Sequence, residues 1–279
     1  MNGRYLRRRL ANGIALTFSV TLTAFALFFL AWILFILVEK GFRYVNLALF
    51  THSTPGASTV TGGLSNAFVG SLLITGLGIL VGAPVGVLAA TWLAEFGGRR
   101  RLTMVVRFIN DVLLSAPSIV IGVFVYGVVV APMGHFSGWA GATALAIIAL
   151  PVVVRTTDNM LQLVPDQLRE AAVALGAPRW RVTVSIVYRA SIAGIITGIL
   201  LAIARIIGEA APLLFTSLGN QFFSANLNAP IAALPQVLFN FAMGPYATWH
   251  HLAWAGALIS TLFVLVLMIV ARLFSGRSK

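Results

Sequence analysis

Apolar positions along this chain gather into long runs that short polar segments separate. An α-helix needs about 20 consecutive apolar residues to cross the hydrocarbon core of a bilayer. The pattern predicts six transmembrane helices, near residues 14–38, 66–92, 109–131, 138–155, 190–216 and 252–273. The fold class we expect is all-α: a polytopic membrane protein in which residues 14–275 form one six-helix domain, with residues 1–13 before it and a tail at 276–279.

Composition supports this class, and the placement of charge predicts the topology. Of the 279 residues, 59% are apolar and 9% are charged, whereas about 25% are charged in a soluble domain. The net charge of +12 invites a nucleic-acid partner, but all except three of the 19 basic residues fall on one side of the predicted helices. Basic residues concentrate on the cytoplasmic side of membrane proteins. We therefore expect a multi-pass protein of the cytoplasmic (inner) membrane, in contact with lipid, with both termini cytoplasmic and no nucleic-acid partner.

Glycine and proline indicate how the predicted helices pack and bend. Gly78, Gly82 and Gly86 recur at every fourth position of the second apolar run, and this spacing lets another helix approach closely. A merely flexible apolar helix is the alternative interpretation. Proline removes a helical hydrogen bond and bends a helix. Kinks are therefore expected at three prolines inside the apolar runs: Pro84, Pro117 and Pro212.

Two connections on the outer side differ in character. The segment 39–65 is rich in Ser, Thr, Gly and Pro, which is typical of an exposed loop. The segment 218–251 carries no charge and is half apolar. We expect it to lie in the membrane interface or to dip into the membrane, with Trp249 and Trp254 near the lipid headgroups.

The sequence contains no recognisable motif for catalysis. A P-loop needs Gly-Lys-Ser/Thr, and the only two lysines, Lys40 and Lys279, do not occur in that context. There is no cysteine, and the four histidines show no metal-ligand spacing with carboxylates. We therefore expect no enzyme activity, no catalytic residue, no metal site and no cofactor in this chain.

The polar segment 156–189 is the longest one predicted on the cytoplasmic side. Pro165 is suited to begin a short helix, Gly176 is suited to end it in a left-handed turn, and Arg179 begins a second helix. Such a helix pair is either an ordinary amphipathic surface or a docking element for a partner protein. The candidate docking residues are a carboxylate, two small residues, the turn glycine and an aromatic anchor of the kind enriched at interfaces: Glu170, Ala171, Ala172, Gly176 and Trp180.

Arg205 and Glu209 are charged residues within the fifth apolar run. A charge at the bilayer centre costs roughly 2.5–3.5 kcal/mol on insertion scales, so neither side chain is expected to face lipid. At positions i and i+4 of a helix they would share one face, and Pro212 would break the helix just beyond them. Transport sites combine broken helices with such charges, so we interpret the pair as part of a solute pathway. A buried structural salt bridge is the alternative.

The cytoplasmic segment resembles the EAA loop of ABC-importer permeases. The shared features are Glu-Ala-Ala at 170–172, Gly-Ala three residues later, a basic and aromatic stretch, and Gly-Ile at 194–195. Where that family usually has Leu-Pro before the next helix, this chain has Tyr188 and Arg189. The resemblance implies that Glu170 and Gly176 belong to the element that couples the permease to its ATPase.

Four strings are similar to the PstA-type permeases of phosphate ABC importers: ARIIGEAAPLLFT, SAPSIVIGVFVYG, LPVVVRTTDNMLQLVP and ALPQVLFNFA. The similarity extends from about Arg8 to Arg272. It implies a type I ABC-importer permease fold and a role for Arg205 and Glu209 in phosphate movement. It also implies a second, PstC-type permease, two PstB-type ATPase subunits that bind ATP and Mg, and an extracytoplasmic PstS-type phosphate-binding protein.

Three alternatives to a phosphate importer stay open at the level of sequence. An ABC importer of the same class that transports another solute, such as sulfate, molybdate or a polyamine, would have an equivalent cytoplasmic loop. An ion-coupled secondary transporter would need no ATPase and often contains inverted repeats, which the chain does not display. A structural scaffold would have no use for Arg205 and Glu209.

Overall fold

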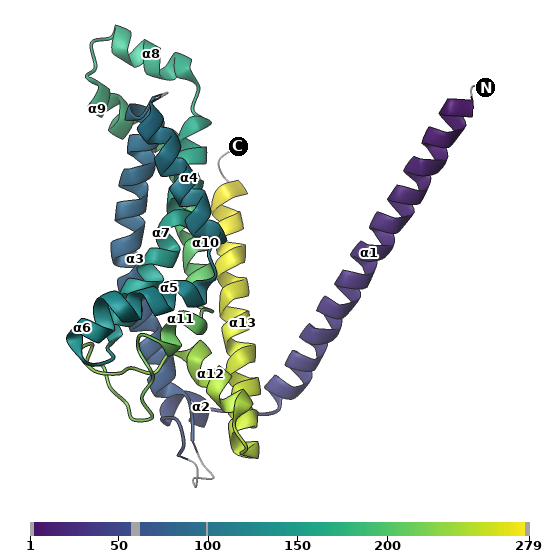
Figure 1. Ribbon diagram of the computed structural model, residues 1–279, viewed down its shortest axis with the longest axis vertical. Helices are drawn as coiled ribbons and strands as arrows, with labels where there is room; N and C mark the ends of the chain where they lie inside the picture. Colours follow the sequence, from purple (N-terminus) through teal and green to yellow (C-terminus); the bar gives the residue numbers. More distant parts are fainter. Residues whose placement is uncertain (1–2, 57–61, 99, 277–279) are drawn as a thin grey trace.

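The computed structural model describes residues 3–56, 62–98 and 100–276, which form helices joined by irregular segments (Figure 1). In chain order the elements are α1 (Gly3–Phe42), α2 (Ala48–Thr51), α3 (Ser65–Thr91), the π-helical η1 (Trp92–Phe96), α4 (Arg101–Ser115), α5 (Ser118–Val125), the π-helical η2 (Tyr126–Val130), α6 (Ala131–Met133), α7 (Gly138–Gln162), α8 (Asp166–Ala174), α9 (Arg179–Val182), the π-helical η3 (Thr183–Val187), α10 (Tyr188–Ile206), α11 (Ala211–Leu214), α12 (Leu234–Met243) and α13 (Ala247–Gly276). The all-α class is confirmed. Parts of the two predicted terminal segments, residues 1–2 and 277–279, lie outside the described residues.

Among the described residues, five helices are long and apolar enough to cross a membrane, and a bent pair provides a sixth span if its two parts are counted together. The five are Arg7–Phe42, Ser65–Phe96, Gly138–Gln162, Arg179–Ile206 and Ala247–Leu273. Each overlaps a run predicted from the sequence. α7 continues beyond the predicted end at residue 155 because polar residues on its extra turns find partners inside the protein, as Asp158 does with Arg107.

The third apolar run is broken, not kinked. α4 and the helix that begins at Ser118 meet at 103°, so the predicted span over 109–131 bends at the expected Pro117, but as a sharp break between two helices. Ala116 and Pro117 both have extended backbone, with ψ of 134° and 130°. A residue before proline is sterically driven out of the helical region, and proline offers no N–H to continue the helix. By contrast, α3 runs through Pro84 without interruption.

The fifth apolar run also ends earlier than predicted. A continuous helix covers Arg179–Ile206, followed by a non-helical turn and the four-residue α11. The predicted span 190–216 is therefore wrong at its C-terminal end. Pro212 occupies the first turn of α11, the place where a missing N–H costs nothing, so it starts a new helix.

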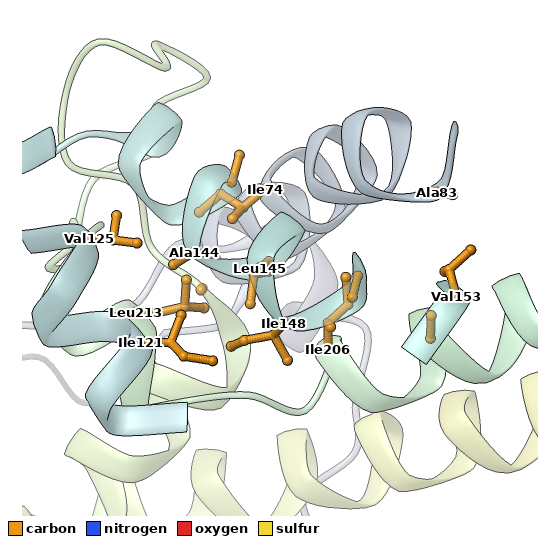
Figure 2. Packing of buried hydrophobic residues seen from close by; sticks show 14 of the residues in the cluster. Ile74, Ala83, Ile121, Val125, Ala144, Leu145, Ile148, Val153, Ile206 and Leu213 are labelled. Carbon is orange, nitrogen blue, oxygen red and sulfur yellow. The ribbon is translucent and has the colours of Figure 1, made fainter. Parts of the chain in front are cut away.

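The glycines of α3 confirm the predicted close helix packing. A Cβ at Gly82 would lie 3.0 Å from the carbonyl oxygen of Ala146 on α7, and a Cβ at Gly86 would lie 2.9 Å from Cβ of Val153. Only a residue without a side chain allows such backbone contact. Figure 2 shows the cluster of buried residues that this packing places at the centre of the bundle, with contributions from α3, α5, α7, α10 and α11.

α1 leans away from the other helices (Figure 1). Its most apolar stretch is wholly exposed, and it packs on α13 only near its own C-terminal end, where a Cβ at Gly41 would lie 2.7 Å from Cβ of Leu258. The start of α1, the end of α13 and α8 lie at the top of Figure 1. We call this the α8 end, and we call the opposite end, which carries α2 and α12, the α12 end.

The uncharged segment 218–251 folds back over the α12 end. Its first part is irregular, and Leu218 is joined to Ile231 by an isolated β-bridge. The backbone N–H of Leu234 then donates to the hydroxyl of Ser71 on α3 at 2.6 Å. α12 buries its apolar side against α3 and α13. The segment is therefore an integral layer of the fold.

Candidate functional site

The polar segment 156–189 folds as the sequence predicts, into two short helices around a glycine turn. α8 follows Pro165, whose backbone is extended, and ends before Gly176, which has φ of +81°. The N–H of Ala177 donates to the carbonyl of Ala172 at 3.1 Å, and the N–H of Gly176 donates to Val173 at 2.9 Å. This pair of bonds is the Schellman cap, which favours glycine at the left-handed position.

Most of the candidate docking residues lie on the surface of this loop. Glu170, Ala171 and Gly176 are exposed, and Trp180 is 60% exposed, with the guanidinium of Arg181 over its ring. Ala172 is the exception. It is buried in a cluster with residues of α7, α9 and α10, so it attaches α8 to the bundle and presents no surface to a partner.

Arg169 is the main polar connection between α8 and the bundle, and sequence reasoning missed it. Its guanidinium binds both carboxylate oxygens of Glu95 in η1, with Nη2–Oε1 at 2.8 Å and Nε–Oε2 at 3.2 Å. It also donates to the backbone carbonyls of Leu161 and Val164, at the end of α7, and to Asp166. The hydrogen bond with Glu95 raises the pKa of Arg169, against the opposing effect of burial.

Two further ion pairs join α4 to α7 near the α8 end. Arg107 binds Asp158 with two hydrogen bonds, at 3.0 and 3.1 Å, and Gln162 donates to the same carboxylate at 2.8 Å. Arg155 contacts Asp111 at 3.3 Å, but both side chains are about half exposed. Exposed ion pairs contribute little to stability. The carboxylate of Asp158 is buried, so it needs its hydrogen-bond partners to offset the loss of hydration. The sequence offered no signal for these pairs, because the partners are 51 and 44 positions apart.

Arg205 and Glu209 do not form the predicted helical i, i+4 pair. α10 ends at Ile206, so Arg205 lies in its last turn, while Glu209 lies in the turn that follows, where its N–H donates to Ile206 at 3.2 Å. The four ion pairs found among the described residues join other side chains. The salt-bridge alternative is therefore not realised in this structure. Arg205 is exposed and Glu209 half-buried, and a cation in the last turn is favoured by the helix dipole.

The two broken helices meet at the centre of the bundle. A Cβ at Gly122 of α5 would lie 2.6 Å from Cα of Pro212 in α11, so only glycine permits this contact. Figure 2 shows Ile121 and Val125 of α5 beside Leu213 of α11 and Ile148 of α7. The turn that carries Glu209 directly precedes this contact. Irregular backbone at membrane depth is tolerated where protein or a water-filled cavity surrounds it.

Comparison with known proteins decides the family. Residues 82–279 match the model of the family described as "Binding-protein-dependent transport system inner membrane component". The chain belongs to this family. It is therefore a transport component and a multi-pass protein of the inner membrane.

The similarity to named relatives covers nearly the whole chain. A protein of Yersinia pestis named "Phosphate transport system permease protein PstA" is 57% identical over 272 residues, which cover 98% of this chain and 92% of the relative. A Haemophilus influenzae protein of the same name is 55% identical over 278 residues, covering 100% and 98%. "Phosphate transport system permease protein PstA 1" of Mycobacterium tuberculosis strain H37Rv is 38% identical over 270 residues, covering 94% and 85%.

Solved structures support the fold of this inner membrane component. A chain of the MetNI methionine ABC transporter, in a crystal form described as inward facing, superposes with a TM-score of 0.60. The match covers 77% of this chain and 93% of that chain at 17% sequence identity. The ABC-importer permease fold that the sequence resemblance implies is therefore confirmed.

Proposed function

We propose that this chain is the permease subunit of an ATP-driven importer of inorganic phosphate. The observation that carries the proposal is the 57% identity, over 98% of this chain, to a protein named as a phosphate transport system permease. The glycine-capped α8 with exposed Glu170 and Trp180 supports it, because an importer permease needs a rigid element for its ATPase to move.

The partners in this proposal follow from the permease role. A second, PstC-type permease completes the translocation path, and a PstS-type binding protein delivers phosphate from outside. Two PstB-type ATPase subunits bind ATP and Mg, and their closure moves the cytoplasmic loops so that access to the path alternates. In this chain the coupling surface consists of exposed residues on or beside α8: Glu170, Ala171, Gly176 and Trp180.

The proposed phosphate path passes the turn between α10 and α11. Arg205 is a fixed cation with several N–H donors, a chemistry that suits tetrahedral oxyanions. It has no ion-pair partner in the described part of the chain, so its donors are available to a solute. Glu209, four residues on, limits how strongly the anion is held, because a like charge nearby weakens its binding.

The proposed topology places the α8 end in the cytoplasm. Residues 1–13 and the tail at 276–279 are cytoplasmic segments on either side of a single permease domain, 14–275, whose coupling loop is 156–189. The basic residues clustered near the α8 end support this orientation, and so does the arrangement of the helix ends in Figure 1.

The decisive experiment is uptake of radiolabelled phosphate by cells that lack their own phosphate importers and express this chain with its partner subunits. We expect uptake that needs the ATPase subunit and that excess sulfate, molybdate or polyamine does not inhibit. Uptake of one of those solutes in place of phosphate would refute the proposal that phosphate is the substrate. Phosphate uptake without any ATPase subunit would refute the importer class.

A further inference from the structure

A cavity of about 280 Å³ at the α12 end is lined by the irregular segment after α11 and by residues of α12 and α13. Its walls include polar side chains from four parts of the chain: Thr54, Asn220, Gln236, Asn240 and Trp249. Water occupies about 30 Å³ per molecule in the liquid, so the cavity has room for more than one isolated water. None of its described lining residues is charged.

One wall of this cavity is built from strained backbone. Leu218 has φ of +58° and is the only non-glycine residue with positive φ among those that the structure describes. Gly219 follows with φ of +89°. Non-glycine residues in this region are held there by surrounding structure, and they concentrate at functional sites. Here the β-bridge from Leu218 to Ile231 and the N–H bond from Leu218 to Leu213 hold the turn.

Two of the described residues that line the cavity have a buried hydrogen-bond donor without a partner. Within the described residues, three buried side-chain polar atoms have no hydrogen-bond partner, and two of them, Gln236 Nε2 and Trp249 Nε1, belong to residues that line this cavity. Gln236 is 1% exposed, and its Oε1 contacts the hydroxyl of Ser217 at 3.4 Å. An indole N–H is a donor only. Buried donors without partners are rare in native proteins and call for an explanation such as a bound molecule.

The chemistry of these groups selects the class of ligand. The described lining has no carboxylate for a cation, whereas a ligand rich in acceptor oxygens matches the side-chain donors that Gln236, Asn240 and Trp249 carry. Neutral donors fixed in a partly enclosed site stabilise oxyanions well, because they need no reorganisation. We propose that this cavity binds a tetrahedral oxyanion, as a receiving site on the outer side of the permease. Under the proposed function, on which this identification rests, the anion is inorganic phosphate.

The position of the cavity fits a step before the Arg205 turn. The wall at 218–221 follows α11, which follows Glu209, so one continuous segment joins the cavity to the proposed path. Neutral donors would bind the anion without the strong attraction of a fixed cation. Phosphate released by a binding protein could then pass onward to Arg205.

The test uses tryptophan fluorescence of the complete importer in lipid nanodiscs, with the binding protein omitted and inorganic phosphate as the titrant. We expect a saturable change in the unaltered complex, and no such change with chloride at matched ionic strength. Trp249→Phe keeps the aromatic stacking on Phe241 but removes both the N–H and the fluorophore, so loss of the change assigns the response to Trp249, and the Gln236 variants then test the hydrogen-bond donors. Trp139→Phe is the matched control, because the Trp139 N–H already has a partner, Asn228, at 3.1 Å.

Substitutions of Gln236 provide a second, independent test of the site. Gln236→Leu removes the amide and should weaken the apparent phosphate affinity by about 10- to 100-fold, the usual effect of losing a hydrogen bond to a charged group. Gln236→Glu places a carboxylate in the cavity and should abolish the response. An unchanged response in Trp249→Phe or in a Gln236 variant that keeps the wild-type melting temperature would overturn the site and leave a water-filled structural cavity.

Different experimental outcomes would overturn the cavity site and the proposed function. No phosphate response in a complex that still takes up phosphate overturns the cavity site alone. A phosphate response that depends on Trp249, in a complex that transports a different solute, overturns the proposed substrate and supports the oxyanion site.

Discussion

Arg169 and Glu95 are 74 positions apart, yet the guanidinium of the one holds both carboxylate oxygens of the other at 2.8–3.2 Å. The pair joins α8 to η1, the continuation of α3. Because α3 packs against α7 through its glycines, the pair connects α8, through η1, to the contact between α3 and α7.

Breaking this pair should uncouple the loop from the helices. The side chain of Glu95 is 9% exposed, so Arg169→Met leaves a nearly buried carboxylate without its partner and should cost about 3–5 kcal/mol. The double change Arg169→Met with Glu95→Leu should recover most of that stability, because it removes both charges. We expect the double variant to hydrolyse ATP at the normal basal rate but to import less phosphate per ATP.

Thermal unfolding and the ratio of phosphate transported to ATP hydrolysed, both measured on reconstituted complexes, check this prediction. Arg189→Met is the control, since Arg189 is exposed and has no ion-pair partner in the part of the chain that the structure describes. Normal coupling in the double variant would mean that the pair serves stability only.

The glycine turn of the loop should be sensitive to any side chain. A Cβ at Gly176 meets nothing within 4 Å, so Gly176→Ala tests the left-handed backbone alone, at a cost of about 1–2 kcal/mol. We expect weaker co-purification of the ATPase subunit with unchanged membrane insertion. Glu170→Lys, which reverses an exposed charge, should weaken co-purification without altering stability. Full ATPase recovery in both variants would refute the docking role.

The role of Arg205 can now be tested with single substitutions, because it has no ion pair whose partner would be left buried and charged. Arg205→Met should insert at the wild-type level. Uptake of phosphate should fall by about 10-fold or more, as expected when a charge-assisted hydrogen bond to the anion is lost. The double variant Arg205→Met with Glu209→Leu should be equally stable and equally inactive. Wild-type uptake in either variant, measured with radiolabelled phosphate, would assign Arg205 to packing.

The contact between α3 and α7 predicts opposite effects for two glycines on one helix. Gly82→Ala places a methyl group 3.0 Å from the backbone of Ala146 and should destabilise the fold by about 1–3 kcal/mol. Gly76→Ala meets nothing within 4 Å and should stabilise α3 by about 0.5–1 kcal/mol. Melting temperatures of the two purified variants check the prediction, and equal shifts would contradict it.

Topology is tested with reporters at two positions that lie outside the described residues. A reporter fused after Lys279 should be cytoplasmic and one inserted at Ser58 should be external, because basic residues concentrate at the α8 end. Both reporters on the same side of the membrane would contradict the six-span arrangement.

The sequence by itself determined the class of this protein and the shape of the loop at 156–189. Run length and charge asymmetry are properties of the chain in one dimension, and they suffice to predict apolar helices that cross a membrane. The loop was predictable because Pro165 and Gly176 act on the backbone at their own positions. The spacing of Gly78, Gly82 and Gly86 likewise predicted close packing without naming its partner helix.

Only the tertiary structure decided where the broken helices turn and which charges meet. An apolar run does not reveal that Ala116 and Pro117 form a 103° corner, or that α10 stops at Ile206 and Pro212 starts a separate helix against Gly122. The predicted Arg205–Glu209 pair failed for the same reason, since a rule for helical neighbours does not apply where the helix has ended. The contacts Arg169–Glu95 and Arg107–Asp158, like the cavity beside Trp249, join distant residues, and local periodicity carries no information about such contacts.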